Sequence, residues 1–165
     1  MSVSGSKKTD YGALTTIRQA RASELGYIRI LGKEVFEQYG PYEDLLSDWF
    51  GSGLAVTLLA SLEERPLGFA MFGHLEGLRY PPGMCELLAI AVEPAEWNRG
   101  IGGLLMTEVE RKATAMNVEK MILHTAVENF RGQRLFTKHG FIPLEVKRHF
   151  YPEGQDALTM CKWYV

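Results

Sequence analysis

A short glycine-rich run is the part of the sequence best suited to hold a ligand. Residues 98–103 read Asn-Arg-Gly-Ile-Gly-Gly and connect an apolar run to a pattern typical of an amphipathic helix. A glycine-rich turn into a helix directs free backbone N–H groups and the positive end of the helix dipole at one spot. This arrangement suits an anion, although the same kind of turn can also serve close packing alone.

Two well-known phosphate-binding motifs do not fit these residues. A Walker A loop requires Gly-Lys-Ser/Thr at the start of the helix, where this chain has Gly102-Gly103-Leu104. A dinucleotide-binding fingerprint requires wider spacing than that of Gly100, Gly102 and Gly103, and an acidic residue at the end of the next strand. The sequence therefore excludes both motifs and leaves a different anion site open.

Two ionisable side chains could move a proton near this turn. Glu86 lies in the apolar run MCELLAIAV, residues 84–92, where a carboxylate costs free energy unless it is partnered, hydrated or used in function. His124 lies near the end of an expected strand, residues 120–125, and imidazole titrates close to neutral pH. Each could act as a general base, yet a glutamate at a wet sheet edge or a solvated histidine needs no function.

The composition indicates one compact domain. The chain has 165 residues, of which 46% are hydrophobic and 23% charged, and this is enough to bury a single core. The formal net charge of −2 argues against a protein that binds nucleic acid by bulk phosphate neutralisation. Any anionic ligand must then be held by a local site. We expect residues 13–165 to form this domain and residues 1–12 to be a flexible arm.

Cysteine use and hydropathy favour a cytoplasmic protein. Cys85 and Cys161 lie in apolar runs and not at the spacing of a disulfide framework, so we expect two buried thiols. The polar start shows no signal-peptide pattern, and nowhere do eighteen uninterrupted apolar residues occur, so no membrane association is expected. His74, His139 and His149 are scattered and lack zinc-site spacing, so no metal is expected.

The pattern of apolar residues predicts an α+β fold. The expected order is strand, two helices, three strands, helix, strand, helix and two strands. These elements are residues 14–20, 25–35, 42–50, 54–62, 67–75, 84–92, 104–116, 120–125, 130–139, 142–148 and 156–164. A crossover through a helix between residues 84–92 and 120–125 predicts one parallel strand pair in a mixed, mostly antiparallel sheet.

Several stretches resemble the GNAT superfamily of acetyltransferases. Its motif A, Q/R-x-x-G-x-G/A, follows a strand with a small apolar end and a proline turn, and this chain has LLAIAVEPAEWNRGIGGLL. The stretches TIRQARASEL, ENFRGQRLFTKHGF and RHFYPEGQDALTM resemble the family's first strand and helix, its asparagine-containing turn and its last hairpin. The last of these is most similar to the branch that acetylates the N-terminal alanine of ribosomal proteins. The resemblance implies the GNAT fold, with a splayed parallel strand pair, and use of acetyl-CoA.

The resemblance assigns the glycine-rich turn to the pyrophosphate of acetyl-CoA. Backbone N–H groups of residues 98–103 would bind it, and the end of the preceding strand would pair with the pantetheine arm. The implied co-substrate-binding residues are Ile90, Ala91, Val92, Asn98, Arg99, Gly100, Ile101, Gly102, Gly103, Asn129 and Phe136. Trp97 departs from the motif, because Gln or Arg is usual at its position, and this leaves Arg99 as the local cation.

The resemblance also implies catalytic and acceptor-binding positions. Glu86 falls where histone-type members carry a catalytic glutamate, and His124 falls where the alanine-acetylating branch carries its glutamate base. The tyrosine that usually protonates the CoA thiolate is replaced by Phe136, which cannot donate a proton. Tyr151 is the nearest replacement for that acid.

Aromatic residues are candidates for the acceptor site. Phe150 and Tyr151 match the aromatic pair that holds a peptide N-terminus in the alanine-acetylating branch. Tyr39 and Tyr42 flank Gly-Pro and could form the opposite wall, although both pairs could also serve packing alone.

The sequence therefore predicts an acetyl-CoA-dependent N-acetyltransferase. The expected acceptor is the α-amine of a protein or peptide N-terminus, which would attack directly in a ternary complex. The alternatives are a small-molecule amine acceptor, or an acyl-CoA sensor without efficient turnover, for which Phe136 is the best argument. The expected partners are acetyl-CoA and the amine, with neither nucleic acid nor membrane, and the chain is expected to be a monomer or a homodimer.

Overall fold

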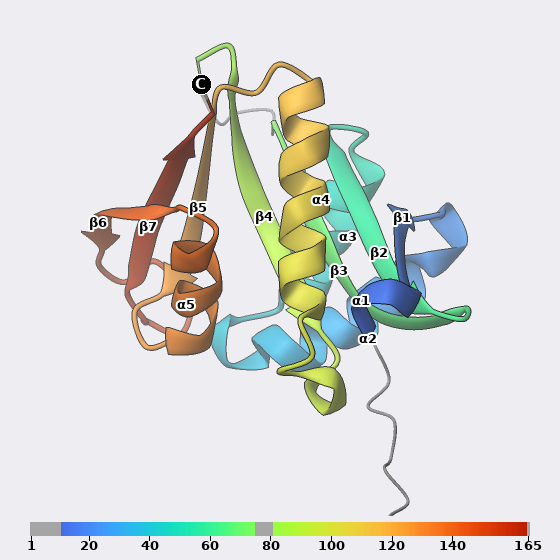
Figure 1. Cartoon of the computed structure of the whole chain (residues 1–165). Coiled ribbons are helices and arrows are strands. Elements are labelled where there is room, and N and C mark those ends of the chain that lie inside the picture. The colour runs from blue at the N-terminus through green and yellow to red at the C-terminus, as the bar shows by residue number, and fades with distance from the viewer. Residues whose placement is uncertain (1–10, 75–80, 165) are drawn as a thin grey trace, which may run out of the picture.

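The computed structural model describes residues 11–74 and 81–164, and their elements follow the expected order (Figure 1). The strands are β1 (Thr15–Gln19), β2 (Ala55–Leu62), β3 (Arg65–Gly73), β4 (Met84–Val92), β5 (Lys120–Ala126), β6 (Ile142–Lys147) and β7 (Ala157–Trp163). The helices are α1 (Tyr11–Leu14), α2 (Leu25–Phe36), α3 (Tyr42–Gly51), α4 (Ile101–Ala115) and α5 (Phe130–Lys138). The predicted α+β fold is confirmed.

One helix differs from the expected organisation. The single turn of α1 begins at Tyr11, so the last two residues of the expected flexible arm are helical. The rest of that arm, residues 1–10, and residues 75–80 lie outside the described residues. The structure therefore adds one helical turn before β1 to the elements predicted from the sequence.

The strands form one mixed sheet in the order β1-β2-β3-β4-β5-β7-β6. All neighbouring pairs are antiparallel except β4 and β5, which are parallel. That pair is short, because residues 84–87 of β4 pair with residues 120–123 of β5 and no further pairs follow. Beyond this point β5 continues beside β7 alone, so a gap opens between the ends of β4 and β5.

A β-bulge in β4 lies where the two parallel strands diverge. The register of β3 against β4 shifts there, and Leu88 is the extra residue on β4. A bulge bends its strand and changes which face the following side chains take. Leu87 accordingly packs in the core beneath α4, whereas Ala89 and Ala91 pack in the core beneath α2 and α3.

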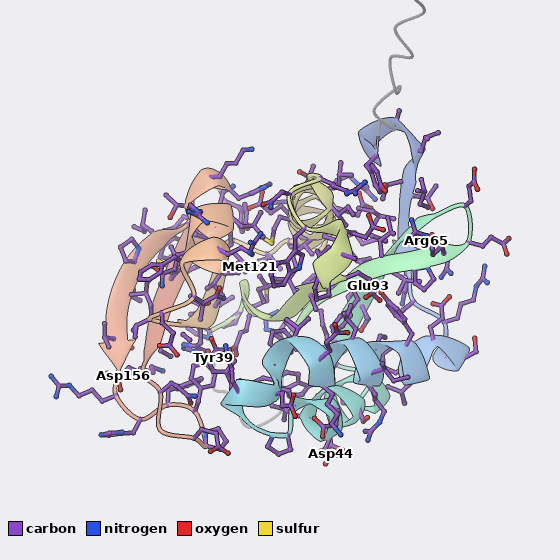
Figure 2. All side chains as sticks on the ribbon, turned by 90° about the horizontal axis from the view of Figure 1, so that it is seen from below. Tyr39, Asp44, Arg65, Glu93, Met121 and Asp156 are labelled. Carbon is purple, nitrogen blue, oxygen red and sulfur yellow. The ribbon has the colours of Figure 1, made fainter. Side chains whose placement is uncertain are left out.

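Helices cover both faces of the sheet (Figure 2). The helices α2 and α3 lie on one face, and α4 and α5 lie on the other. Cys85 and Cys161 are buried free thiols, as predicted. No helix within the described ranges is long and apolar enough to cross a membrane.

Candidate functional site

A groove opens where β4 and β5 diverge, and we call it the α4 groove. It has a cavity volume of about 480 Å³ and lies between the end of β4, the start of α4 and α5. Most of the residues expected to bind acetyl-CoA line it, namely Ile90, Ala91, Val92, Asn98, Gly100, Ile101, Gly102, Gly103, Asn129 and Phe136. The fold therefore brings two separate sequence motifs to one surface.

Two positions of the turn favour glycine, each for a different structural reason. Gly100 has φ of +82° directly before α4, a left-handed conformation that a residue with a Cβ adopts only at a cost. A Cβ on Gly102 would lie 3.3 Å from Cδ2 of Leu135, so glycine there lets α4 and α5 approach closely. Because the first N–H groups of a helix have no intrahelical partners, the groove ends at a site suited to an anion.

Arg99 does not line the α4 groove. Its Nη1 donates to the hydroxyl of Tyr11 at 2.7 Å, and its Nε is 3.4 Å from Oε2 of Glu96. Arg65 also donates to Glu96, at 2.7 Å, and this hydrogen bond is the main reason why the pKa of the Glu96 carboxyl is lowered. Arg99 thus connects α1 to the turn before α4, and its role as a phosphate ligand stays a prediction.

Asn129 borders the groove and also begins α5. Its Oδ1 accepts from the backbone N–H of Gly132 at 3.1 Å, which is an N-cap interaction. Its Nδ2 donates to Oγ1 of Thr125 at 3.0 Å. The Asn129 side chain therefore fixes the start of α5 relative to β5, and a contact to the co-substrate remains a prediction.

The two candidate bases lie side by side. Nε2 of His124 is 3.6 Å from Oε1 of Glu86, and the two side chains are 10% and 12% exposed. On the other side of the ring, Nδ1 of His124 is 3.0 Å from Oγ1 of Thr159, which lies opposite on β7. Strands β4, β5 and β7 thus hold a carboxylate, an imidazole and a hydroxyl in one row.

The electrostatic setting keeps His124 neutral at physiological pH. Burial lowers the pKa of His124 to about 4, and the charge of Lys147 acts in the same direction. The nearby carboxylate of Glu86 acts against both effects, because an opposite charge favours the imidazolium. At neutral pH the row therefore contains an uncharged imidazole beside a carboxyl group.

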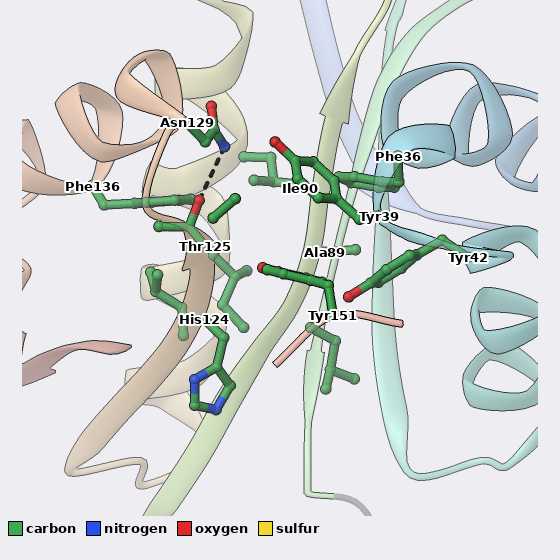
Figure 3. A pocket seen from close by; sticks show the side chains of 14 residues that line it. Phe36, Tyr39, Tyr42, Ala89, Ile90, His124, Thr125, Asn129, Phe136 and Tyr151 are labelled. Atoms are coloured by element: carbon green, nitrogen blue, oxygen red, sulfur yellow. Dashed lines mark hydrogen bonds between the residues drawn. The ribbon is translucent and has the colours of Figure 1, made fainter. Parts of the chain in front are cut away.

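A narrow cavity between the ends of β4 and β5, which we call the central passage, contains three tyrosines (Figure 3). The Tyr151 ring centroid is 4.9 Å from that of Tyr39 and 6.3 Å from that of Tyr42. The three tyrosines form one cluster, because the turn after α2 and the start of α3 bring Tyr39 and Tyr42 to the loop before β7. Figure 3 shows Phe136 and Asn129 across the passage from Tyr39.

Burial keeps these phenols protonated. It raises the pKa of Tyr42 to about 12, and it also raises the pKa values of Tyr39 and Tyr151. Phe136 is buried and offers only its ring to the passage. The tyrosine cluster therefore offers protonated phenol groups to the passage.

On the far side of the passage is a wider cavity, which we call the α3 cleft. Its cavity volume is about 900 Å³, and its lining includes Glu86, His124, Tyr42, Phe150 and Tyr151. The ring centroids of Phe150 and His124 are 4.8 Å apart. Phe150, which is expected to contact the acceptor, therefore lies next to one of the two candidate bases.

The central passage connects the other two cavities. It shares Tyr39 and Phe136 with the α4 groove, and it shares His124 and Tyr151 with the α3 cleft. Its own cavity volume is only about 70 Å³. The narrow passage therefore lies between the groove and the cleft, and Glu86 and His124 line the cleft beside it.

Two residues of the site were not expected from the sequence. Thr159 is a buried polar residue within the apolar strand β7, and that setting is the signal that could have identified it. Arg131 is the second residue of α5, and its place among the groove residues depends on how α5 approaches α4. No spacing rule in the sequence connects Arg131 to the glycine-rich turn.

Comparison with known families decides what kind of protein this is. Residues 18–141 match the model of the Acetyltransferase (GNAT) family. The chain belongs to this family. As a GNAT member it is an acetyltransferase that uses acetyl-CoA, and the α4 groove, with its helix N-terminus and open strand end, has the features that this co-substrate needs.

Similar proteins agree with this assignment. An N-alpha-acetyltransferase from Sulfurisphaera tokodaii is 26% identical over 151 residues, which is 87% of this chain and 90% of that protein. A ribosomal-protein-alanine N-acetyltransferase from Brucella melitensis has a TM-score of 0.77 at 20% identity, over 90% of this chain and 99% of that one. The Salmonella typhimurium protein yncA, solved with its cofactor acetyl-CoA, has a TM-score of 0.75 at 19% identity, over 91% and 94% of the two chains.

The described residues do not form the arrangement of a metal-binding site. Among residues 11–74 and 81–164, no group of three or more His, Cys, Asp or Glu side chains is arranged to hold a metal ion. The ionisable side chains that line the α3 cleft are Glu86, His124, Tyr42, Tyr151, Asp44, Asp48 and Lys147.

Proposed function

We propose that this acetyltransferase acts on the α-amine of a protein or peptide N-terminus, by direct attack in a ternary complex. The observation that carries the proposal is the position of Glu86 and His124 where the central passage meets the α3 cleft. An amine in the cleft and a thioester in the groove would meet beside this pair. No nucleophilic side chain is needed between them.

The proposed reaction forms one bond and breaks one. The amine nitrogen attacks the acetyl carbonyl carbon, and the C–S bond breaks when the tetrahedral intermediate collapses. Glu86 takes the proton that the amine loses, directly or through a water. The departing CoA thiolate takes up a different proton and leaves as the thiol.

We assign His124 and Thr159 to the support of Glu86. A carboxylate only accepts hydrogen bonds, so the imidazole nitrogen that faces it, Nε2, carries the proton of the neutral ring. Nδ1 then accepts from the Thr159 hydroxyl, 3.0 Å away. Thr159 is in this assignment a positioning residue that sets the tautomer of His124.

Tyr39 is better placed than Tyr151 to protonate the thiolate. Tyr39 borders both the passage and the α4 groove, from which the sulfur would come, whereas Tyr151 borders the passage and the cleft. Tyr39 also lies across the passage from Phe136 (Figure 3). We therefore propose Tyr39 as the acid and keep Tyr151, with Tyr42 and Phe150, as contacts for the acceptor.

The form of the cleft favours a peptide over a small amine. The α3 cleft is wide and extends from the passage along α3, whereas the passage itself admits only a thin group. A peptide could place its N-terminus at the passage and lay its next residues along the cleft. The similarity to N-alpha-acetyltransferases supports the same acceptor class.

The test is acetylation of a peptide library varied at its first two residues, beside a panel of amino acids, polyamines and aminoglycosides. Products are identified by mass spectrometry, and CoA release is followed with a thiol reagent. We expect acetylation of peptide α-amines, with a clear preference among first residues. Acetylation of small amines alone would refute the peptide assignment, and acetyl-CoA binding without thiol release would support a sensor.

A further inference from the structure

The residue that departs from the family motif has a defined structural use. Nε1 of Trp97 donates to the carbonyl oxygen of Val92 at 2.8 Å, which fastens the indole beside the end of β4. The guanidinium of Arg131 lies over this indole, with Cζ 4.2 Å from the ring centroid. A guanidinium on an indole face is favourably placed, because the face carries negative charge density.

A second contact fixes the direction of the Arg131 side chain. Its Nη1 donates to Oδ1 of Asn98 at 3.1 Å. Arg131 belongs to α5 and Asn98 to the turn before α4, so the contact spans the α4 groove at its anion-binding end. Both supports, an amide and an indole, are uncharged and leave the charge of the guanidinium uncompensated.

Arg99 and Arg131 differ in whether a carboxylate compensates the charge of the guanidinium. Arg99 pairs with the Glu96 carboxylate and lies outside the groove lining. Arg131 lines the groove, and in the described part of the chain no carboxylate lies within ion-pair distance of it. A guanidinium has five N–H donors, so one hydrogen bond to Asn98 leaves others for a ligand.

We propose that Arg131, held by Trp97 and Asn98, binds the pyrophosphate of acetyl-CoA. The inference rests on the use of acetyl-CoA by this family. The backbone N–H groups at the start of α4 would bind the phosphates from one side and the Arg131 guanidinium from the other. Trp97 therefore does not weaken the phosphate site by replacing Gln or Arg, because its ring supports a cation that comes from another helix.

The experiment measures acetyl-CoA binding by calorimetry in variants of three arginines. Arg131→Gln is expected to raise the Kd about tenfold or more, which is the usual effect of losing a hydrogen bond to a charged group. Arg134→Gln is the matched control, because Arg134 is an exposed arginine of the same helix that does not line the groove. Arg99→Gln tests the residue that the motif alone indicates.

We expect the Kd of Arg131→Gln to lie far above that of Arg134→Gln, which should stay close to the unmodified protein, and we expect a smaller effect for Arg99→Gln than for Arg131→Gln. An Arg131→Gln protein that binds as tightly as the control would overturn the inference. Thermal unfolding without ligand checks that each variant is folded, and Arg131→Lys, which keeps the charge but not the planar group, should lie between.

A second ligand, 3′-dephospho-CoA, tests whether Arg131 contacts the pyrophosphate or the 3′-phosphate. With 3′-dephospho-CoA the loss in Arg131→Gln should be as large as with CoA, because both ligands carry the pyrophosphate. A loss that disappears with 3′-dephospho-CoA would overturn the assignment to the pyrophosphate. Since binding is measured without an acceptor, failure of the peptide assignment would leave this result unaffected, and absence of acetyl-CoA binding to the unmodified protein would contradict the function itself.

Discussion

The α4 groove and the α3 cleft lie on two sides of one passage, yet they are built differently. The groove takes most of its lining from two short stretches, residues 90–103 and 129–138, and much of what it offers is backbone. The cleft takes its lining from α3, β4, β5 and the loop between β6 and β7, and it offers side chains. A site made of backbone leaves a local pattern in the sequence, whereas a site made of distant side chains does not.

We expect the same difference to separate the residues that bind acetyl-CoA from the residues that act in catalysis. Variants on the cleft side should lower the rate and leave acetyl-CoA affinity unchanged. Variants of residues that line the groove but not the passage should change the affinity and leave the rate at saturation nearly unchanged. Variants that mix the two effects would show that the passage does not divide the functions.

The largest effect is expected for Glu86→Gln. Loss of a general base typically lowers kcat by about 10²- to 10⁴-fold, and the isosteric amide keeps the shape of the side chain. Because burial lowers the pKa of His124 to about 4, this histidine is already neutral from about pH 5 upward. It should therefore contribute no limb to the kcat profile near pH 6.5.

The measurement is kcat against pH at saturating acetyl-CoA and acceptor, together with the Kd for acetyl-CoA. Glu145→Gln, an exposed carboxylate on β6, is the control and should match the unmodified protein. A Glu86→Gln protein with full kcat would exclude Glu86 as the base.

A smaller effect is expected for Tyr39→Phe. Removal of a general acid should lower kcat, by roughly tenfold to a hundredfold, with little change in the KM of the acceptor. Tyr151→Phe should instead raise that KM, because Tyr151 borders the cleft and not the groove. Steady-state kinetics with one peptide distinguish the two variants, and the reverse pattern would return the acid role to Tyr151.

Thr159→Val tests the support of His124. The variant keeps the shape of the side chain and removes the hydroxyl that contacts Nδ1. If Thr159 sets the tautomer, kcat should fall about tenfold, in line with one hydrogen bond in the active site, while Thr159→Ser restores most of it. Full kcat in Thr159→Val with a loss in Thr159→Ser would indicate a packing role, because valine keeps the methyl group that serine lacks.

The smallest effect is expected for Gly100→Ala. A Cβ there meets no atom within 4 Å, so the cost comes from the left-handed φ of +82° alone. We expect about 1 kcal/mol less stability and a several-fold higher Kd for acetyl-CoA, with kcat at saturation unchanged. Gly26→Ala in α2, also without a contact but with an ordinary helical φ, should be neutral or slightly stabilising in urea unfolding.

The sequence was sufficient for most of the elements because they depend on local patterns. The strand and helix periods predicted the parallel pair of β4 and β5, and the glycine-rich turn lies at the start of α4, which begins at Ile101 and not at residue 104 as expected. Glu86 was recognisable as a charge within an apolar strand. These features need no knowledge of which segments meet in space.

The remaining parts of the site depend on contacts between distant segments. Arg99 turns to Tyr11 because α1 packs near the turn, and nothing in residues 98–103 indicates this. Arg131 reaches Trp97 because α5 begins beside the gap between β4 and β5. Tyr39 joins Tyr151 because α2 ends against the loop before β7.

The central passage has a consequence for the order of events in turnover. Because the α4 groove and the α3 cleft open on different sides of the passage, neither reactant has to cross the other's path. In the proposed arrangement, the acetylated product would leave through the cleft while free CoA still occupies the groove, and CoA would also be free to leave first. The proposed arrangement therefore imposes no compulsory sequence of product release, and product-inhibition kinetics would test this.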